Sequence, residues 1–264
     1  MFQNVASVDF KQILKNIFNI NNIVIYILAF LVSSNWTTFE YSLLGISFMA
    51  AALSADIPLV GVIIATLVGA FVGHGVAGGV AFIAIMLVFF VLTLLFRPKV
   101  SISDRNEGLK LGSRVFWSCL IILTAKDLSQ ITLFASLFFA FIDSSIVYAF
   151  YKIFVNGIVV IRDVFDKKVF TVEEYLGVVA LVSVAFAMSA FRLDRLGNVG
   201  IIAQNVIIAV MLMWIGLKNN MLVSLMAGLV CGLATITVNS SLASYTIVYM
   251  IACFAGSLRK QSIT

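Results

Sequence analysis

The sequence predicts an all-α polytopic membrane protein, a bundle of about ten transmembrane helices with both termini in the cytoplasm. Of the 264 residues, 62% are hydrophobic and only 11% are charged, and the mean hydropathy is +1.13. A soluble domain usually contains about 25% charged residues, and it cannot bury this much apolar surface because much of a compact globule faces solvent. The apolar residues form unbroken blocks rather than the alternation of a membrane β-barrel, which favours helices.

Charge divides the chain into a short start, a long apolar body and a short end. Residues 1–20 are expected to form a cytoplasmic or interfacial amphipathic lead-in, because apolar residues recur there at helical spacing beside polar ones such as Lys11 and Lys15. An early start of the first membrane helix would explain the same pattern. Residues 21–258 are expected to form the transmembrane helix bundle, and residues 259–264 a cytoplasmic end.

Apolar segments follow one another along this body, and each is predicted as a membrane helix. They cover about 22–34, 41–54, 57–72, 76–96, 112–125, 130–160, 175–191, 198–216, 221–238 and 243–257. A helix that crosses a bilayer needs about 20 residues, so the shorter segments are expected to use polar flanks. Two alternatives stay open. In the first, segments 41–54 and 57–72 are a single broken or re-entrant element around Asp56-Ile57-Pro58 and not two helices. The second concerns segment 130–160, which is long enough to be tilted, kinked or extended into the cytoplasm.

The basic residues set the orientation of these helices. With the N-terminus inside and alternating crossings, only Lys126, Arg192 and Arg195 of the 17 Lys and Arg residues fall outside. Cytoplasmic loops of membrane proteins are enriched in Lys and Arg, so both termini are predicted to be cytoplasmic. A nucleic-acid partner is not expected, because it would need the basic residues gathered on one soluble face. The expected partner is the lipid bilayer.

Two polar loops, 97–111 and 161–174, are the largest and are both expected on the cytoplasmic side. In the second, Thr171-Val172-Glu173-Glu174 has the pattern of a capping box, in which a Thr and a Glu side chain each accept a hydrogen bond from the other's backbone N–H. This pattern predicts that a helix begins there.

Asp143 is the most costly residue inside an apolar segment. An aspartate at the centre of a membrane helix costs about 2.5 to 3.5 kcal/mol, so it is expected to face the bundle interior. Lys152 follows on the opposite face of the same helix, and the two are not expected to pair. Asp143, Lys152 and Asn156 are the candidate intramembrane polar residues. Asp143 forms an ion or signalling site, or it anchors neighbouring helices through hydrogen bonds. Asn156 lines a substrate path or holds helices together.

Other polar residues in apolar segments have the same two interpretations. The amides of Asn198, Gln204, Asn205 and Asn239 either line a substrate path or hold helices together. His74, the only histidine, has no carboxylate near it in sequence and is interpreted as a polar residue at a helix end.

Glycines at helical spacing predict close contacts between helices. The candidates are Gly69, Gly73, Gly75, Gly79, Gly228 and Gly232. Three intervening residues place each pair on one helix face, where the missing side chains let backbones approach closely. The spacing favours tight packing within the bundle or self-association of the chain, and it does not distinguish between them.

No residue pattern indicates chemistry in this chain. No phosphate-binding loop, nucleophile elbow, paired zinc ligands or dinucleotide fingerprint occurs in the right sequence context. Cys119, Cys231 and Cys253 are dispersed in apolar segments and are interpreted as small packing residues. No catalytic residue, metal ligand or cofactor is expected, so these residues are not expected to form an enzyme.

Several segments, taken in order along the chain, are similar to those of a known protein family. They are NIVIYILAFLVS at 22–33, YKIFVNGIVVI at 151–161 followed by KKVFTVEE at 167–174, and GLVCG at 228–232 with AGSLRK at 255–260. Together they resemble the N-terminal polytopic membrane region of the stage II sporulation protein E family of clostridium-like Firmicutes. The likeness covers nearly the whole chain and is strongest in the middle segment.

The resemblance implies a division of labour. In that family the membrane region precedes a regulatory and self-association region and a metal-dependent PP2C-type serine/threonine phosphatase, which activates the first forespore sigma factor at the polar septum. This sequence stops at Thr264, before the aspartates that would bind the phosphatase metals, so it is similar to a fragment or a truncated homologue. Mn²⁺ or Mg²⁺ is expected only for that missing domain.

The function expected from the resemblance is to anchor, localise and regulate a sporulation phosphatase in the bacterial cytoplasmic membrane, with enrichment at the division septum. Self-association and contacts with septal division proteins are expected with it. The alternative is a small ion-coupled membrane transporter, with Asp143, Asn156, Gln204 and Asn205 as its polar path. A third alternative is a membrane assembly partner with neither role, which associates through the helix faces that contain the paired glycines.

Overall fold

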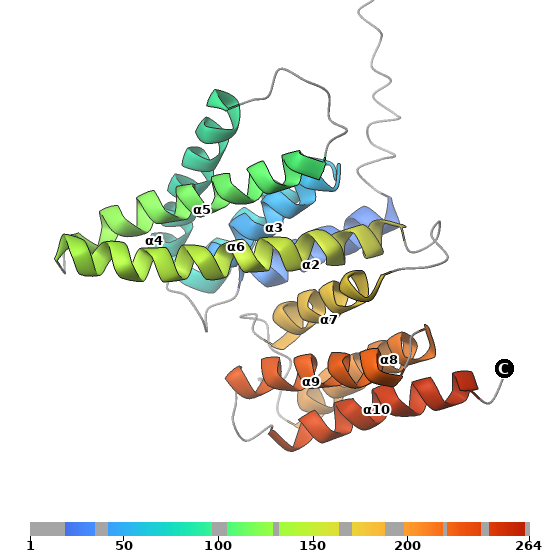
Figure 1. The fold of residues 1–264 in the computed structure, drawn as a ribbon. Coiled ribbons are helices and arrows are strands. Elements are labelled where there is room, and N and C mark those ends of the chain that lie inside the picture. Colours follow the sequence, from blue (N-terminus) through green and yellow to red (C-terminus); the bar gives the residue numbers. More distant parts are fainter. Residues whose placement is uncertain are drawn as a thin grey trace, which may run out of the picture.

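The computed structural model is all-helical over the residues that it describes (Figure 1). These residues are 19–34, 42–96, 105–128, 132–163, 171–187, 198–218, 221–238 and 243–261. The all-α prediction is therefore confirmed for this part of the chain. The predicted amphipathic lead-in, residues 1–20, lies almost entirely outside the described ranges.

The helices follow the apolar segments closely. They are α2 (Ile20–Ser33), α3 (Leu43–Ser54), α4 (Leu59–Leu95), α5 (Arg105–Asp127), α6 (Leu133–Asp163), α7 (Val172–Ala187), α8 (Asn198–Lys218), α9 (Met221–Val238) and α10 (Ala243–Gln261). The helix α9 has the predicted bounds. The helix α5 begins at Arg105 rather than near residue 112, because a helix continues through polar residues that hydropathy does not register.

The predicted helices 57–72 and 76–96 differ from the structure, where they form the single element α4, interrupted at Gly75. Gly75 has φ 67° and ψ −166°, a backbone conformation that is essentially restricted to glycine. The ring of Phe71 lies against Gly79 across this break. The chain thus changes direction within one residue, where the sequence predicted a short loop.

A tight turn separates α3 from α4. The Ala55 N–H donates to the Ala51 carbonyl over 3.1 Å, and the Ile57 N–H donates to the Ala52 carbonyl over 3.1 Å. Asp56 has a positive φ of 56°, which Asp tolerates better than most residues. Pro58 stands just before the first turn of α4, where its missing N–H breaks no helical hydrogen bond. The two helices are therefore separate elements.

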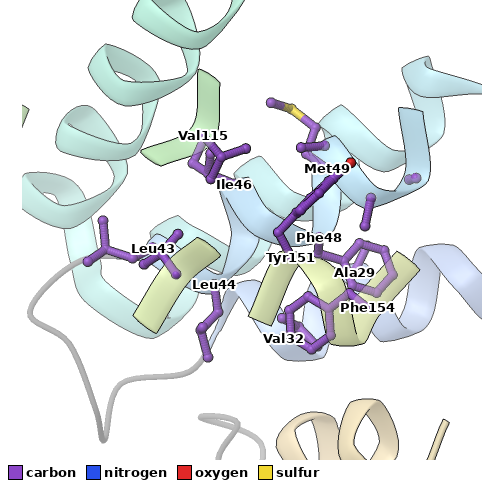
Figure 2. Packing of buried hydrophobic residues seen from close by; sticks show 14 of the residues in the cluster. Ala29, Val32, Leu43, Leu44, Ile46, Phe48, Met49, Val115, Tyr151 and Phe154 are labelled. Carbon is purple, nitrogen blue, oxygen red and sulfur yellow. The ribbon is translucent and has the colours of Figure 1, made fainter. Parts of the chain in front are cut away.

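Buried apolar side chains form two clusters that meet at α7. The larger cluster is built mainly from α2 to α6, and Figure 2 shows part of it, with Phe48 of α3 beside Phe154 of α6. The smaller cluster joins α7 to α8, α9 and α10. Tyr175 and Val179 of α7 belong to the smaller cluster, whereas Leu181 belongs to the larger one. The helix α7 therefore connects the two groups of helices.

Several helix ends lie on one side of the molecule. The Asn21 side-chain amide donates to the Arg162 carbonyl over 3.0 Å, and Arg162 Nη1 donates to the Ala55 carbonyl over 2.7 Å. The start of α2, the end of α3 and the end of α6 therefore meet. Figure 1 shows the end of α10 on this same side, to the right of the view. The first and last described helices thus have their outer ends on a common side.

Within the described part of the chain, α4 and α6 are the two helices that are long and apolar enough to cross a membrane. In their most apolar stretches only 28% of the residues of α4 and 22% of those of α6 are buried, so most of each stretch is on the surface of the described structure. Apolar side chains cover their outer faces, and Phe134 of α6 is 83% exposed. Exposed apolar surface on this scale indicates contact with lipid or with another protein.

Candidate functional site

The three polar candidates, Asp143, Lys152 and Asn156, all lie on α6. The helix α6 packs against α2, α3, α5 and α7. A buried hydroxyl fixes one of these contacts, since Ser47 Oγ of α3 donates to the Val147 carbonyl over 2.8 Å. Aromatic packing fixes the same pair, with the rings of Phe48 and Phe154 5.8 Å apart.

Asp143 is half-buried on the face of α6 that is turned toward α5. Its carboxylate lies within electrostatic range of the Cys119 thiol of α5. The neighbouring Ser144 is fully buried, and its hydroxyl has no hydrogen-bond partner among the described residues. Ser145 donates to the Phe141 carbonyl over 2.7 Å within the helix. Asp143 therefore belongs to the interface between α5 and α6.

Lys152 is held by aromatic rings of its own helix. Its Nζ lies 5.7 Å from the ring centroid of Tyr148 and 5.7 Å from that of Tyr151, within the range of a cation–π contact. A β-carbon on Gly112 of α5 would lie 2.6 Å from the Tyr148 ring, so α5 closes over these rings. Nine residues separate Lys152 from Asp143, about 13 Å along the axis, and the two do not form one site.

Asn156 lies beside the closest approach of α6 to α7. A β-carbon on Gly157 would lie 2.8 Å from the Gly177 carbonyl oxygen, and one on Gly177 would lie 2.7 Å from the Gly157 nitrogen and 2.8 Å from Asn156 Cβ. The two backbones can approach this closely only because both residues are glycine. The three polar candidates of α6 thus have three different neighbours: α5, their own helix and α7.

Four of the candidate packing glycines lie against neighbouring helices of the same chain. Gly69 and Gly73 of α4 lie against the backbone carbonyls of Phe30 and Ser34, at the end of α2. On α9, Gly228 lies against the backbone of Met250 of α10, and Gly232 lies against the side chain of Thr246. These two glycine pairs therefore form contacts between helices of the same chain.

Gly75 and Gly79 have other roles. A β-carbon on Gly75 would meet no atom within 4 Å, so this glycine is required by its backbone conformation and not by a neighbouring helix. Gly79 contacts the ring of Phe71 in the preceding half of α4.

Sequence reasoning missed two further glycine pairs. Gly157 with Gly177 forms the crossing of α6 and α7, and Gly216 of α8 packs against Gly256 and the Cys253 carbonyl of α10. No three-residue spacing marks these glycines, because each helix supplies a single glycine to its crossing. The sequence contains no pattern that could have paired them.

Arg162 also has more contacts than the sequence suggested. Its Nε and Nη2 donate to the two carboxylate oxygens of Asp163 over 2.6 and 3.0 Å, and its Nη1 donates to the Ala55 carbonyl at the end of α3. A guanidinium is always charged and offers several donors in a fixed plane. A cation also suits a helix C-terminus, where carbonyl groups point outward. Arg162 therefore connects the end of α6 to the end of α3 by a hydrogen bond.

The amide of Asn205 is hydrogen-bonded to a tyrosine of the smaller cluster. The Tyr249 hydroxyl of α10 donates to Asn205 Oδ1 of α8 over 2.5 Å, so Asn205 joins two helices. The side chains of Asn198 and Gln204 lie outside the described part of the structure, as does all of Asn239.

Comparisons with protein-family models, with curated proteins and with solved structures gave no match. The resemblance to the stage II sporulation protein E family therefore depends on the sequence segments themselves. Among the described residues, no group of three or more His, Cys, Asp or Glu side chains could hold a metal ion. The contacts around the polar and glycine candidates are contacts between packed helices.

Proposed function

We propose that the chain is a multi-pass protein of the bacterial cytoplasmic membrane, with about ten crossings and both termini cytoplasmic, which anchors and regulates a PP2C-type phosphatase of the stage II sporulation protein E kind. The observation that best supports this orientation is the common side of the helix ends. The start of α2 and the ends of α3, α6 and α10 share it, and the positive-inside rule independently assigns the flanking basic residues to the cytoplasm.

The break in α4 supports the number of crossings. A continuous helix of 37 residues would be about 55 Å long, well beyond the roughly 30 Å hydrocarbon core of a bilayer. With the break at Gly75, the half that ends at Leu95 contains about 20 residues and matches the core by itself. Counting α4 as two crossings restores the alternation that the charge distribution requires.

The anchoring function follows from the sequence segments and from this orientation. A membrane confines an attached domain to two dimensions and raises its effective concentration for self-association. A cytoplasmic end after α10 would leave such a domain beside its cytosolic substrate. Polar contacts such as Arg162 with Ala55, and glycine crossings such as Gly157 with Gly177, suit a rigid support.

Topology reporters test the orientation. A fluorescent protein fused after Thr264 should fluoresce, and alkaline phosphatase fused there should be inactive, because the end is cytoplasmic. The matched control is a fusion after Leu128, between α5 and α6, where the reporters should give the opposite result. An active alkaline phosphatase after Thr264 would overturn the proposal.

Localisation tests the function. In sporulating cells, a fluorescent fusion of the chain should concentrate at the polar septum, and an attached PP2C-type domain should activate the forespore sigma factor more than the soluble domain does at equal abundance. Asp143→Asn should leave septal placement unchanged. A uniform membrane distribution, or uptake of a solute that Asp143→Asn abolishes, would favour the transporter alternative.

A further inference from the structure

A cavity of about 630 Å³ opens between the end of α4 and the first half of α5. Its lining residues come from these two helices and are Leu92, Phe96, Lys110, Ser113, Arg114, Trp117 and Ile121. On α5 they recur every three or four residues and so form one face of the helix. This volume lies in the range of small-molecule sites.

One end of the cavity is cationic. Arg114 is only 9% exposed, and its Nη2 donates to the Phe96 carbonyl at the end of α4 over 2.6 Å. That bond orients the guanidinium and uses one of its five N–H donors. Lys110 stands one helical turn earlier and is exposed. Ser113 lies between them, and its hydroxyl donates to the Lys110 carbonyl over 2.8 Å, which leaves the oxygen able to accept.

The other end is apolar. Leu92, Trp117 and Ile121 line it, and Trp117 is 54% exposed. From Lys110 to Ile121 the face of α5 extends about 16 Å. Charge at one end, an indole in the middle and aliphatic groups at the other is the order of polarity found from the headgroup region into the hydrocarbon of a bilayer leaflet.

We propose that this cavity binds one anionic phospholipid of the cytoplasmic leaflet. The phosphate lies among Lys110, Ser113 and Arg114, and part of an acyl chain lies along Leu92, Trp117 and Ile121. The inference rests on the membrane orientation proposed above, with the start of α5 cytoplasmic, and does not depend on the phosphatase. Basic pockets between membrane helices on the cytoplasmic side bind anionic headgroups in this way.

Charge complementarity selects an anionic occupant. The residues that line the cavity include two basic ones, Lys110 and Arg114, and no acidic one. A zwitterionic lipid would gain less from this excess of positive charge. A free phosphate would use the cationic end alone and would leave the apolar wall uncovered.

Brominated lipids test the site directly, because bromine on an acyl chain quenches a nearby tryptophan. The full chain is placed in vesicles of brominated phosphatidylglycerol or brominated phosphatidylcholine, and Trp117 fluorescence is isolated by comparison with Trp117→Phe. The Trp117 quenching should show a several-fold preference for phosphatidylglycerol at low salt. Lys110→Gln should remove most of that preference, because one basic group at the membrane surface contributes about 1 kcal/mol, or roughly fivefold. Arg114 is retained because it also caps α4.

The matched control is Lys152→Gln, which removes a lysine that does not line the cavity and should leave the preference unchanged. Equal quenching by the two lipids in the wild-type protein, or equal losses in Lys110→Gln and Lys152→Gln, would overturn the proposal. Inorganic phosphate serves as the second probe. If it abolishes the lipid preference at millimolar concentration, while Ile121→Ser leaves the preference unchanged, the site holds a free anion and the lipid assignment is wrong. If the protein inserts into the vesicles but shows no lipid preference, the lipid site is wrong while the membrane proposal stands. If the protein does not insert at all, the membrane proposal itself is wrong.

Discussion

Replacing Gly157 by valine tests how closely α6 and α7 must approach. A β-carbon at this position would lie 2.8 Å from the Gly177 carbonyl oxygen, whereas ordinary contacts begin at 3.4 Å, so the backbones would have to separate by about 0.6 Å. A helix carbonyl cannot swing away as the end of a flexible side chain can. A gap of about 0.5 to 1 Å already removes a quarter to a half of the dispersion energy of the atoms that line it.

The expected cost follows from two opposing terms. Overpacking usually costs about 1 to 3 kcal/mol, while exchanging glycine for alanine inside a helix stabilises it by about 0.8 to 1.0 kcal/mol. Alanine at position 157 is therefore a weak test. Valine adds two more carbons and stiffens the side chain, so we expect Gly157→Val to lower the free energy of unfolding by about 2 to 3 kcal/mol. For a chain of this size the Tm should fall by roughly 4 to 12 °C.

Thermal stability in mild detergent measures this effect. The fraction of protein that remains monodisperse after heating is followed through a fluorescent fusion. Ala149→Val is the matched control, because it places the same side chain on an exposed position of the same helix. Gly177→Val should reproduce the loss, and the double variant should cost less than the sum, since the two residues touch. A Gly157→Val protein as stable as Ala149→Val would refute the reasoning.

Other substitutions test the remaining contacts with the same heating assay unless stated. Arg162→Gln should lower the free energy of unfolding by about 1 kcal/mol, since it loses the charged bond to Ala55, and the value is small because the side chain is 38% exposed. Stability equal to the wild type would show that this bond contributes nothing. Thr171→Ala should cost about 1 kcal/mol and speed amide exchange in the first turn of α7, whereas Thr171→Ser should not; unchanged exchange would exclude a capping role. Gly75→Ala should cost about 1 to 3 kcal/mol because of its backbone conformation, and an unaffected variant would mean that α4 can straighten.

Helices were predictable here because hydropathy is a local property. The bounds of α9 agree with its apolar segment, and the capping box at Thr171 forms as predicted: its N–H donates to Glu174 Oε2 over 2.7 Å, and the Glu174 N–H donates to Thr171 Oγ1 over 3.3 Å. The single interruption at Gly75 was not predictable in detail, because glycine is also common inside membrane helices.

Partners of individual residues were much harder to predict. The pattern along α6 assigned Asp143 and Lys152 to opposite faces, but it could not say that one meets α5 and the other two tyrosines of its own helix. Gly157 and Gly177 show the same limit, since each is the single glycine of its helix. Which helices touch depends on the whole arrangement, and a spacing rule within one helix contains no information about it.

The double membership of α7 has a consequence for how the molecule comes apart. Its first turns complete the interior of α8 to α10 and its later turns complete that of α2 to α6. Melting of either group exposes the α7 side chains that it covers, so the stabilities of the two groups should be coupled through α7. Among the described residues, α7, a helix of 16 residues, therefore forms the packed connection between the two groups.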